Sequence, residues 1–256
     1  MKFTIRRRLF RLWYWYVNKV DRDAEIVCMN YGYSHKDQQV ALDEQDRLNR
    51  YSIQLYHHLA SATEIKHKDI LEIGCGRGGG LYYIARNFSP ASATGVDLNR
   101  EAVAFCNRNF KSDGLSFLQG DAQNLKLKNR SCDVVFNIES SHRYRDMKGF
   151  LGEVYRILRP GGYFLFTDFR YDHEMDEMKK ALESSGMTVL KERVINQEIL
   201  AALALDDERK RKLVKKLAPK FLHKLALNFA GTIGSETYDR FLTHRYIYFS
   251  YVLMKQ

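Results

Sequence analysis

Short apolar runs alternate with amphipathic stretches along the middle of this chain. The runs have the length of buried strands, and the stretches between them repeat apolar residues at helical spacing. The expected strands lie at 70–73, 93–97, 116–122, 132–138, 163–169, 187–194 and 246–254. The expected helices lie at 41–60, 81–85, 100–109, 147–158 and 174–184. Repeated strand–helix units favour parallel pairing with right-handed crossovers. The sequence therefore predicts an α/β fold: a seven-stranded, mostly parallel sheet with helices on both faces.

Two segments do not follow this alternation. Before the last expected strand lie about fifty residues of helical pattern, which is longer than an ordinary connection. The N-terminal segment is basic and aromatic. We expect an N-terminal helical and aromatic lid segment at 1–60, a core at 61–195, a helical cap insertion at 196–245 and the last core strand at 246–256.

The first expected strand ends in a run of glycines. Gly74, Gly76 and Gly79 follow the apolar run 70–73, and a helical pattern comes next. Glycine permits positive φ angles and lets a ligand approach the backbone, and the following helix N-terminus offers free N–H groups. The spacing also fits a dinucleotide fingerprint. Glu72 at the strand end favours a different interpretation from dinucleotide binding. The pattern E-x-G-x-G-x-G resembles the first motif of class I S-adenosylmethionine-dependent methyltransferases.

Polar residues follow the next strands at the edge where such sheets bind ligands. Asp97 ends the second strand, where a carboxylate can accept both ribose hydroxyls of a cofactor. Asp121 and Ala122 follow the third strand, where an acid beside a small residue suits an adenine amino group. Roles in loops or helix caps are the alternatives for both acids. The motifs together predict a Rossmann-like, S-adenosylmethionine-binding core. The expected cofactor contacts are Glu72, Gly74, Cys75, Gly76, Asp97, Leu98, Asp121, Ala122 and Asn137.

A histidine follows the fourth expected strand, where a methyl acceptor would sit. Neutral imidazole can take a proton from a hydroxyl near pH 7, so His142 is a candidate general base. Asp168 ends the adjacent fifth strand and can orient the imidazole or bind the acceptor hydroxyl. A structural loop histidine is the alternative for His142. The expected acceptor pocket is lined by Tyr31, Tyr33, Glu139 and Tyr144, and Phe221 is a further aromatic candidate.

The net charge of +10 is concentrated in two segments. Residues 1–20 carry six Lys/Arg and no acid, and residues 206–224 carry eight Lys/Arg against three acids. Such segments suggest an anionic partner, whether a membrane surface, a nucleic acid or an acidic substrate, although a solvated helix face explains them as well. Arginines mixed with aromatic residues at 1–20 suit a peripheral membrane contact. The alternative is a helix packed on the domain with its arginines outward.

Composition excludes several other classes. The 256 residues include no apolar run near the roughly 20 residues of a membrane span, and the N-terminus lacks the pattern of a signal peptide. The four cysteines form no C-x-x-C pair, so reduced thiols in a cytoplasmic protein are expected and no metal site is predicted.

Further motifs resemble one branch of the class I methyltransferases, the phthiotriol/phenolphthiotriol dimycocerosate methyltransferases and related fatty-acid O-methyltransferases. They are N-Y-G-Y at 30–33, L-Y-H-H at 55–58, E-I-G-C-G-R-G-G-G at 72–80, N-I-E-S-S-H-R-Y at 137–144, L-R-P-G-G-Y-F at 158–164 and T-D-F-R at 167–170. The resemblance covers nearly the full chain. It implies methylation of a hydroxyl on a lipid-like or polyketide small molecule, with Gly74, Gly76 and Asp97 binding the cofactor and His142 as the base.

Three alternatives remain from the sequence. C-methylation of sterol type is one, because Tyr31, Tyr33, Glu139 and Tyr144 can line a site for a developing cation. A non-catalytic binding protein of methyltransferase fold is another, although the intact cofactor motifs oppose it. A nucleic-acid methyltransferase is favoured by charge alone, and the chain has neither an N/D-P-P-Y motif nor a recognisable RNA-binding module.

Overall fold

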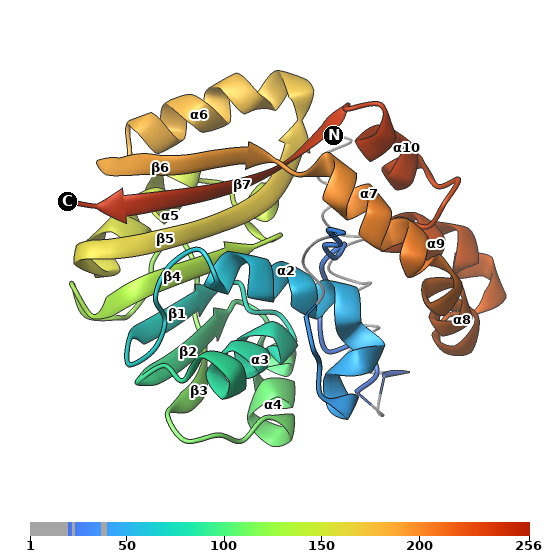
Figure 1. Cartoon of the computed structure of the whole chain (residues 1–256), viewed down its shortest axis with the longest axis horizontal. Helices are drawn as coiled ribbons and strands as arrows, with labels where there is room; N and C mark the ends of the chain where they lie inside the picture. Colours follow the sequence, from blue (N-terminus) through green and yellow to red (C-terminus); the bar gives the residue numbers. More distant parts are fainter. Residues whose placement is uncertain (1–19, 22–23, 37–39) are drawn as a thin grey trace.

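A seven-stranded sheet forms the centre of the molecule in the order β3-β2-β1-β4-β5-β7-β6 (Figure 1). The computed structural model describes residues 20–21, 24–36 and 40–256. The strands are β1 (Asp69–Ile73), β2 (Ser92–Asp97), β3 (Leu115–Gln119), β4 (Cys132–Ile138), β5 (Leu158–Tyr171), β6 (Met187–Val194) and β7 (Tyr246–Lys255). β7 is antiparallel to β5 and β6, and the other neighbours pair in parallel. The predicted fold class is confirmed.

Helices cover both faces of the sheet, as predicted (Figure 1). Residues of the first three helices share a hydrophobic cluster with Ile70, whereas residues of the last two share one with Leu71 and Ile73. This division follows from the alternation of side chains along β1. The helices are α2 (Arg50–Ala60), α3 (Gly79–Phe88) and α4 (Arg100–Asn109) on one face, and α5 (Met147–Ile157) and α6 (Met175–Glu183) on the other.

A helical cap lies between β6 and β7 at one end of the sheet (Figure 1). Its helices are α7 (Asn196–Leu205), α8 (Asp207–Leu217), α9 (His223–Ala230) and α10 (Glu236–Leu242). Asn196 anchors the cap, because its side-chain amide donates to the carbonyls of Phe241 and Tyr246 at 2.9 and 2.7 Å. Around α8 and α9 the buried apolar core is small and consists of Val214, Ala218 and Ala226.

An N-terminal strap, which we define as Asp21 together with residues 24–33, crosses the glycine turn. Nη2 of Arg77 donates to Oδ2 of Asp21 at 2.9 Å, and both side chains are 1% exposed. The N–H of Gly79 donates to the carbonyl of Val27 at 3.1 Å. The strap is therefore bonded directly to the turn that follows β1. The predicted basic helix at 1–20 falls almost entirely outside the described residues.

Several element bounds differ from the prediction. The expected helix at 41–60 is a short 3-10 segment, η1 (Glu44–Asn49), followed by α2. β5 begins at Leu158 rather than at 163, because Leu158 already pairs with Cys132 before the Pro-Gly-Gly turn. Other 3-10 segments are η2 (Ser141–Arg143), η3 (Asp172–Glu174) and η4 (Lys220–Leu222). Within the described chain, no helix combines the length and apolarity that crossing a membrane requires.

Candidate active site

Two glycines of the turn after β1 are required for different reasons. Gly74 has φ +80°, and a Cβ there would lie 2.3 Å from Oγ of Ser140. Gly76 has φ +53°, and a Cβ there would meet nothing within 4 Å. The first glycine thus allows close packing inside the protein, whereas the second borders open space. A side chain at position 76 would fill that space, which fits a turn that a ligand approaches closely.

Asp97 lies beside this open space at the end of β2. Its Oδ2 accepts the N–H of Gly76 at 2.9 Å, and its Oδ1 accepts the N–H of Asn99 at 2.8 Å. Burial raises the pKa of Asp97, and these two backbone donors oppose the rise. Each carboxylate oxygen keeps a second lone pair for a ligand. Leu98, the next residue, is 67% exposed. The carboxylate is thus oriented by the turn it faces, as binding of two neighbouring hydroxyls requires.

Two buried acceptor atoms near the turn lack a partner. Oε1 of Glu72 accepts the Tyr56 hydroxyl at 2.8 Å, while Oε2 has no hydrogen bond, and burial raises the pKa of Glu72 to about 7. Asn137 donates through Nδ2 to the carbonyl of Ile73 and to Oγ of Ser140, both at 2.8 Å, while its Oδ1 is unpartnered. Buried polar atoms normally find partners, so a bound group with N–H donors would suit this site.

The remaining predicted cofactor residues differ in their exposure to solvent. Asp121 is exposed, and its Oδ1 accepts the N–H of Gln123 at 2.9 Å, which lowers its pKa. Ala122 beside it is buried. The Cys75 thiol is also buried and lies against Gly95. An adenine amino group would meet Asp121 at the surface of the molecule.

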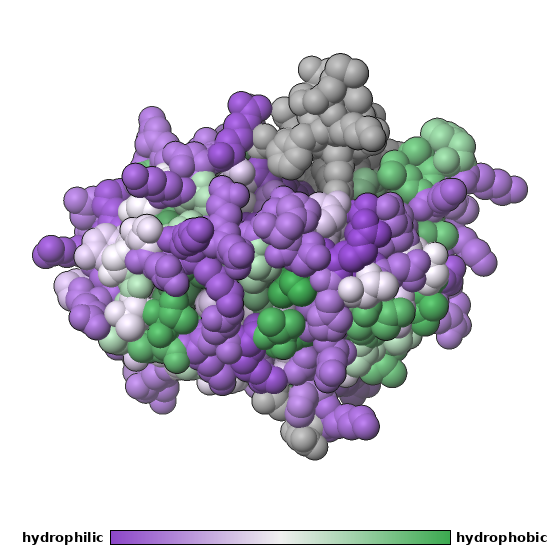
Figure 2. All heavy atoms as spheres, turned by 90° about the horizontal axis from the view of Figure 1, so that it is seen from above, coloured by the Kyte–Doolittle hydropathy of each residue, from purple (hydrophilic) through white to green (hydrophobic). Residues whose placement is uncertain are grey.

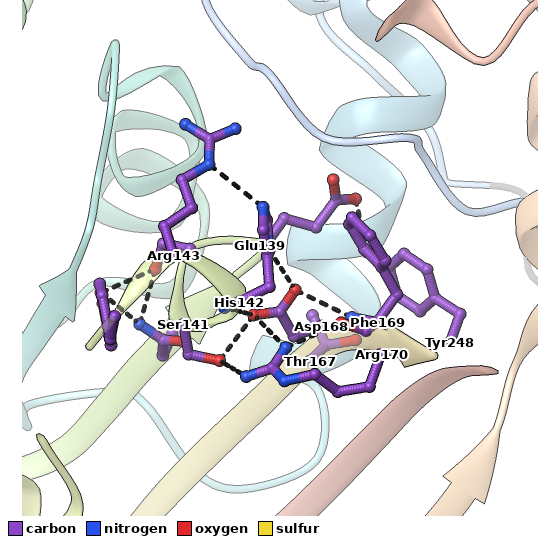
Figure 3. A network of polar contacts seen from close by, with 12 residues as sticks. Glu139, Ser141, His142, Arg143, Thr167, Asp168, Phe169, Arg170 and Tyr248 are labelled. Atoms are coloured by element: carbon purple, nitrogen blue, oxygen red, sulfur yellow. Dashed lines mark hydrogen bonds and ion pairs between the residues drawn. The ribbon is translucent and has the colours of Figure 1, made fainter. Parts of the chain in front are cut away.

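His142 and Asp168 form a buried polar network where β4 and β5 end (Figure 3). Nδ1 of His142 lies 2.7 Å from Oδ1 of Asp168, and Nε of Arg143 donates to Nε2 of His142 at 3.1 Å. A carboxylate only accepts and a guanidinium only donates. These contacts place the ring proton on Nδ1 and leave the imidazole neutral. Burial lowers the pKa of His142, and the charge of Asp168 opposes this.

Asp168 has its polar contacts behind the imidazole. Oδ2 accepts the Ser141 hydroxyl at 2.6 Å and the His142 N–H at 2.9 Å, and Arg170 forms an ion pair with it at 3.2 Å. Burial would raise the pKa of Asp168, but His142 and Arg170 outweigh it and hold the pKa below its ordinary value. Asp168 is therefore an ionised carboxylate that fixes the ring. Of the two roles expected for Asp168, this geometry suits orientation of His142.

A mostly apolar cavity of about 150 Å³ borders His142. The strap, the ends of β4 and β5 and helices α8 and α9 contribute its walls. Its lining residues are Val20, Ile26, Cys28, Met29, Asn30, Tyr31, Asn49, Ser52, Glu139, His142, Arg143, Phe169, Arg209, Lys210, Leu213, Val214, Leu217, Ala226, Phe229 and Ala230. We call this space the acceptor cavity. It combines an apolar surface with a few charged groups, as small-molecule sites do.

Two of the four residues expected to line the pocket lie elsewhere. Tyr31 and Glu139 line the acceptor cavity. Tyr33 instead stacks on His58 with ring centroids 4.3 Å apart, because its ring points into the core beside α2. Tyr144 packs on Phe150, and its hydroxyl contacts Ser140 at 2.9 Å beneath the glycine turn. The aromatic candidate Phe221 is 84% exposed and also lies outside the cavity lining.

Sequence reasoning missed three charged residues. Arg143 was part of a motif but had no assigned role, although its place beside His142 offered a signal. Arg77 lies within the glycine motif, but its contact with Asp21 was likewise not expected from the sequence. Lys210 carries no local signal, because it is one of many basic residues on α8 and only the fold brings it to the cavity.

Comparison with known proteins identifies the family. A family model described as a methyltransferase domain matches residues 71–166. A fatty-acid O-methyltransferase from Mycolicibacterium smegmatis is 41% identical over 87% of this chain and 81% of its own length. The chain belongs to the class I S-adenosylmethionine-dependent methyltransferases. A phthiotriol/phenolphthiotriol dimycocerosates methyltransferase from Mycobacterium tuberculosis is 37% identical over 90% of this chain and 86% of its own. The expected resemblance to this branch is confirmed.

Solved structures share the fold of this methyltransferase. The cyclase SpnF matches with a TM-score of 0.72 and 17% identity, covering 97% of this chain and 95% of its own. Geranyl diphosphate C-methyltransferase from Streptomyces coelicolor, solved with geranyl diphosphate and S-adenosyl-L-homocysteine, matches with a TM-score of 0.67 and 15% identity. It covers 94% of this chain and 95% of its own. Because one neighbour is a cyclase and another methylates carbon, the fold leaves the reaction open.

S-adenosylmethionine is the cofactor of this methyltransferase, and the turn fits it. The open space at Gly76 admits a ligand without a Cβ in the way. Asp97 offers carboxylate lone pairs beside that space, and Glu72 and Asn137 offer unpartnered acceptors. Among the described residues, no group of His, Cys, Asp and Glu could hold a metal ion.

Proposed function

We propose that this methyltransferase transfers a methyl group to a hydroxyl of a lipid-like or polyketide acceptor, with His142 as general base. The supporting observation is the 2.7 Å contact between Nδ1 of His142 and Oδ1 of Asp168 at the wall of an apolar cavity. An aliphatic hydroxyl is a weak nucleophile until its proton is removed. A neutral imidazole whose Nδ1–H is held by a carboxylate presents Nε2 as the proton acceptor.

The protonation states suit this role. When bound, S-adenosylmethionine supplies an electrophilic methyl group on a sulfonium. The acceptor oxygen would take this methyl group in place of its proton, S-adenosylhomocysteine would leave, and Nε2 of His142 would hold the hydroxyl proton. Asp168 then faces an imidazolium and stabilises it, because its own carboxylate is ionised. The apolar walls exclude water, which would otherwise compete for the base.

A labelled-cofactor assay tests this function. The purified protein would be incubated with methyl-labelled S-adenosylmethionine and with three acceptors of equal chain length: a long-chain alcohol, the corresponding fatty acid and the corresponding alkene. We expect label in a methyl ether of the alcohol, identified by mass spectrometry. Label in the alkene alone would support C-methylation instead. Label in none of the three, with intact cofactor binding, would favour a non-catalytic role.

A carboxylate acceptor is the second candidate function. Arg143 and Lys210 bring two cations to the acceptor cavity, and one relative is named a fatty-acid O-methyltransferase. A carboxylate is already ionised at neutral pH and needs no base. Methyl-ester formation that is unchanged in His142→Ala would therefore favour this candidate over hydroxyl methylation.

We further propose that the cap contacts an anionic membrane surface. Phe221 in η4 is 84% exposed, and Lys215, Lys220 and Lys224 near it are exposed lysines. Figure 2 shows apolar side chains gathered among hydrophilic ones at the right-hand side, the side on which Figure 1 draws the cap. An exposed aromatic ring among cations suits a lipid interface. The earlier expectation for residues 1–20 stays a separate prediction.

Vesicle sedimentation tests the membrane contact. We expect Phe221→Ser and Lys220→Glu to weaken binding to phosphatidylglycerol vesicles, and salt to mimic the charge change. Leu48→Ser is the matched control, because Leu48 is 62% exposed in η1. Equal vesicle binding by Phe221→Ser and the control would reject a role for this ring. Preferential binding of RNA over vesicles would indicate that the basic surface binds nucleic acid instead.

A further inference from the structure

Glu139 has an uncommon backbone conformation for its residue type. Its φ is +45°, in the left-handed region that residues with a Cβ rarely adopt. Backbone strain of this kind persists where the surrounding structure holds it, and it collects at functional sites. Here the strained residue follows β4 and turns its side chain away from the Asp168 network toward Tyr248 (Figure 3). The conformation presents a carboxylate to the acceptor cavity.

One oxygen of that carboxylate is fully engaged and the other is available. Oε1 of Glu139 accepts the N–H of Tyr31 at 2.7 Å and the hydroxyl of Tyr248 at 2.5 Å. No hydrogen bond to Oε2 is found within the described part of the chain. Burial raises the pKa of Glu139 to about 8, and its two donors oppose the rise. The side chain is thus fixed by one oxygen and offers the other to the cavity it lines.

Lys210 brings donors to the same cavity from the cap. It lies on α8, far from Glu139 in sequence, and its Nζ is 3.5 Å from the carbonyl of Tyr31, at the limit of a hydrogen bond. Burial lowers its pKa to about 8, while the charges of Asp206 and Glu139 oppose this. Most of the donor capacity of this ammonium group is therefore unused by the described chain.

Glu139 and Lys210 are neighbours that do not touch. Each acts on the pKa of the other, yet within the described part of the chain no ion pair joins the two side chains. A carboxylate and an ammonium that are both partly withdrawn from water attract each other strongly, so their separation leaves room for a bridging group. When both groups are charged, that group must donate to the carboxylate and accept from the ammonium. A hydroxyl does both, whereas a carbonyl cannot donate and a second carboxylate would be repelled by Glu139.

We propose that Glu139 and Lys210 form a second subsite, which binds a hydroxyl of the acceptor that is not methylated. The acceptor is then a lipid diol, with one hydroxyl at His142 and another between Glu139 and Lys210. This inference rests on the proposed function, since it assumes an alcohol at His142. His142, Glu139 and Lys210 all line the same cavity of about 150 Å³. The two hydroxyls are therefore separated by only a few carbon atoms, as in a 1,3-diol.

The test compares two acceptors in three proteins. The acceptors are hexadecan-2-ol and hexadecane-2,4-diol, and the proteins are wild type, Lys210→Met and the control Lys212→Met. Lys212 lies on the same helix, but its side chain is 74% exposed and pairs with Glu208 at the surface. We expect wild type and the control to prefer the diol roughly 10-fold or more in kcat/KM, as one charge-assisted hydrogen bond allows. Lys210→Met should lose that preference, because the kcat/KM for the diol should fall by a larger factor than the kcat/KM for the mono-alcohol.

Glu139→Gln supplies a second variant that preserves side-chain shape, and it should also reduce the diol preference. An equal loss for both acceptors would show a merely structural pair and overturn the subsite. Wild type without a diol preference, but with turnover of both alcohols, would also reject the subsite while leaving the proposed function intact. Turnover of palmitic acid but of neither alcohol would reject the proposed function. In that case the subsite is tested by calorimetric titration of the two alcohols in the presence of S-adenosylhomocysteine. Equal affinities for the diol and the mono-alcohol would contradict the subsite.

Discussion

Nε of Arg143 donates a hydrogen bond to Nε2 of His142 across 3.1 Å, so the nitrogen proposed as the base is already occupied. An acceptor hydroxyl must replace this bond before it can transfer its proton. Arg143 also lowers the pKa of His142, because a second positive charge beside the ring disfavours imidazolium. The arginine thus keeps the base neutral and competes for its lone pair.

Replacing Arg143 should shift the pH dependence of methyl transfer. The rate requires neutral His142 and should rise with pH through its pKa, which burial holds below the ordinary value of about 6.5. Arg143→Met removes a charge that lowers this pKa, so the midpoint should move to higher pH. Single-turnover rates across pH 4–9 measure it. Arg145→Met, an exposed arginine two residues on, should leave the midpoint in place; a matching shift there would contradict the local explanation.

Removing the imidazole should lower the chemical rate without affecting the cofactor. We expect His142→Ala to reduce single-turnover transfer to an alcohol by roughly 10²–10⁴-fold. Asp168→Asn should cost less, because it weakens the orientation and stabilisation of the ring but leaves the proton acceptor in place. Cofactor affinity should stay nearly constant, since the glycine turn and Asp97 lie on other loops.

A second histidine–aspartate pair provides the control. His173 and Asp172 are 3.2 Å apart but 72% and 61% exposed, so His173→Ala should retain wild-type turnover. A wild-type single-turnover rate in His142→Ala would show that the acceptor needs no base.

Cofactor binding should depend on the space at Gly76. Gly76→Val places a branched side chain in that space and in a left-handed backbone, so titration calorimetry should detect little binding of S-adenosylmethionine. Asp97→Ala should cost about 1.5–3 kcal/mol, the range for hydrogen bonds to a charged group. Gly152→Val is the control, because a Cβ there also meets nothing within 4 Å but lies on α5. If folded Gly76→Val binds S-adenosylmethionine with unchanged affinity, the turn is not part of the cofactor site.

Breaking the strap's ion pair should destabilise the protein. Asp21→Ala leaves the guanidinium of Arg77 buried without its carboxylate, which costs about 3–5 kcal/mol for buried pairs. Urea unfolding followed by far-ultraviolet circular dichroism measures the decrease in the free energy of unfolding. Glu208→Ala breaks an exposed pair with Lys212 and should leave the midpoint almost unchanged. Equal midpoints for the two variants would show that the buried pair is not stabilising.

The core of the fold was predictable because its strands and helices have strong local patterns. The apolar run before Gly74 and the acid at Asp97 each identify a strand end. Asn99 caps α4 by accepting the N–H groups of Glu101 and Ala102. Parallel pairing then brings these strand ends to one edge of the sheet. The contact between His142 and Asp168 followed from the same argument.

The cavity walls were less predictable, because they depend on contacts distant in sequence. Tyr33 and Tyr144 lie in motifs near the site, but their rings found better packing on His58 and Phe150 than in the cavity. Lys210 reaches Tyr31 only because the cap folds over the strap, a separation of 179 residues. A pattern of helical periodicity gives the length of α8 but not the face it turns toward the cavity.

The strap that is bonded to the glycine turn also forms part of the acceptor cavity. Val27 accepts from Gly79 at the turn, while its neighbours Ile26 and Cys28 line the cavity. A displacement of the strap that admits one substrate therefore alters the binding site of the other. Affinities coupled in this way are reciprocal: any factor by which S-adenosylmethionine tightens acceptor binding is the factor by which the acceptor tightens the cofactor.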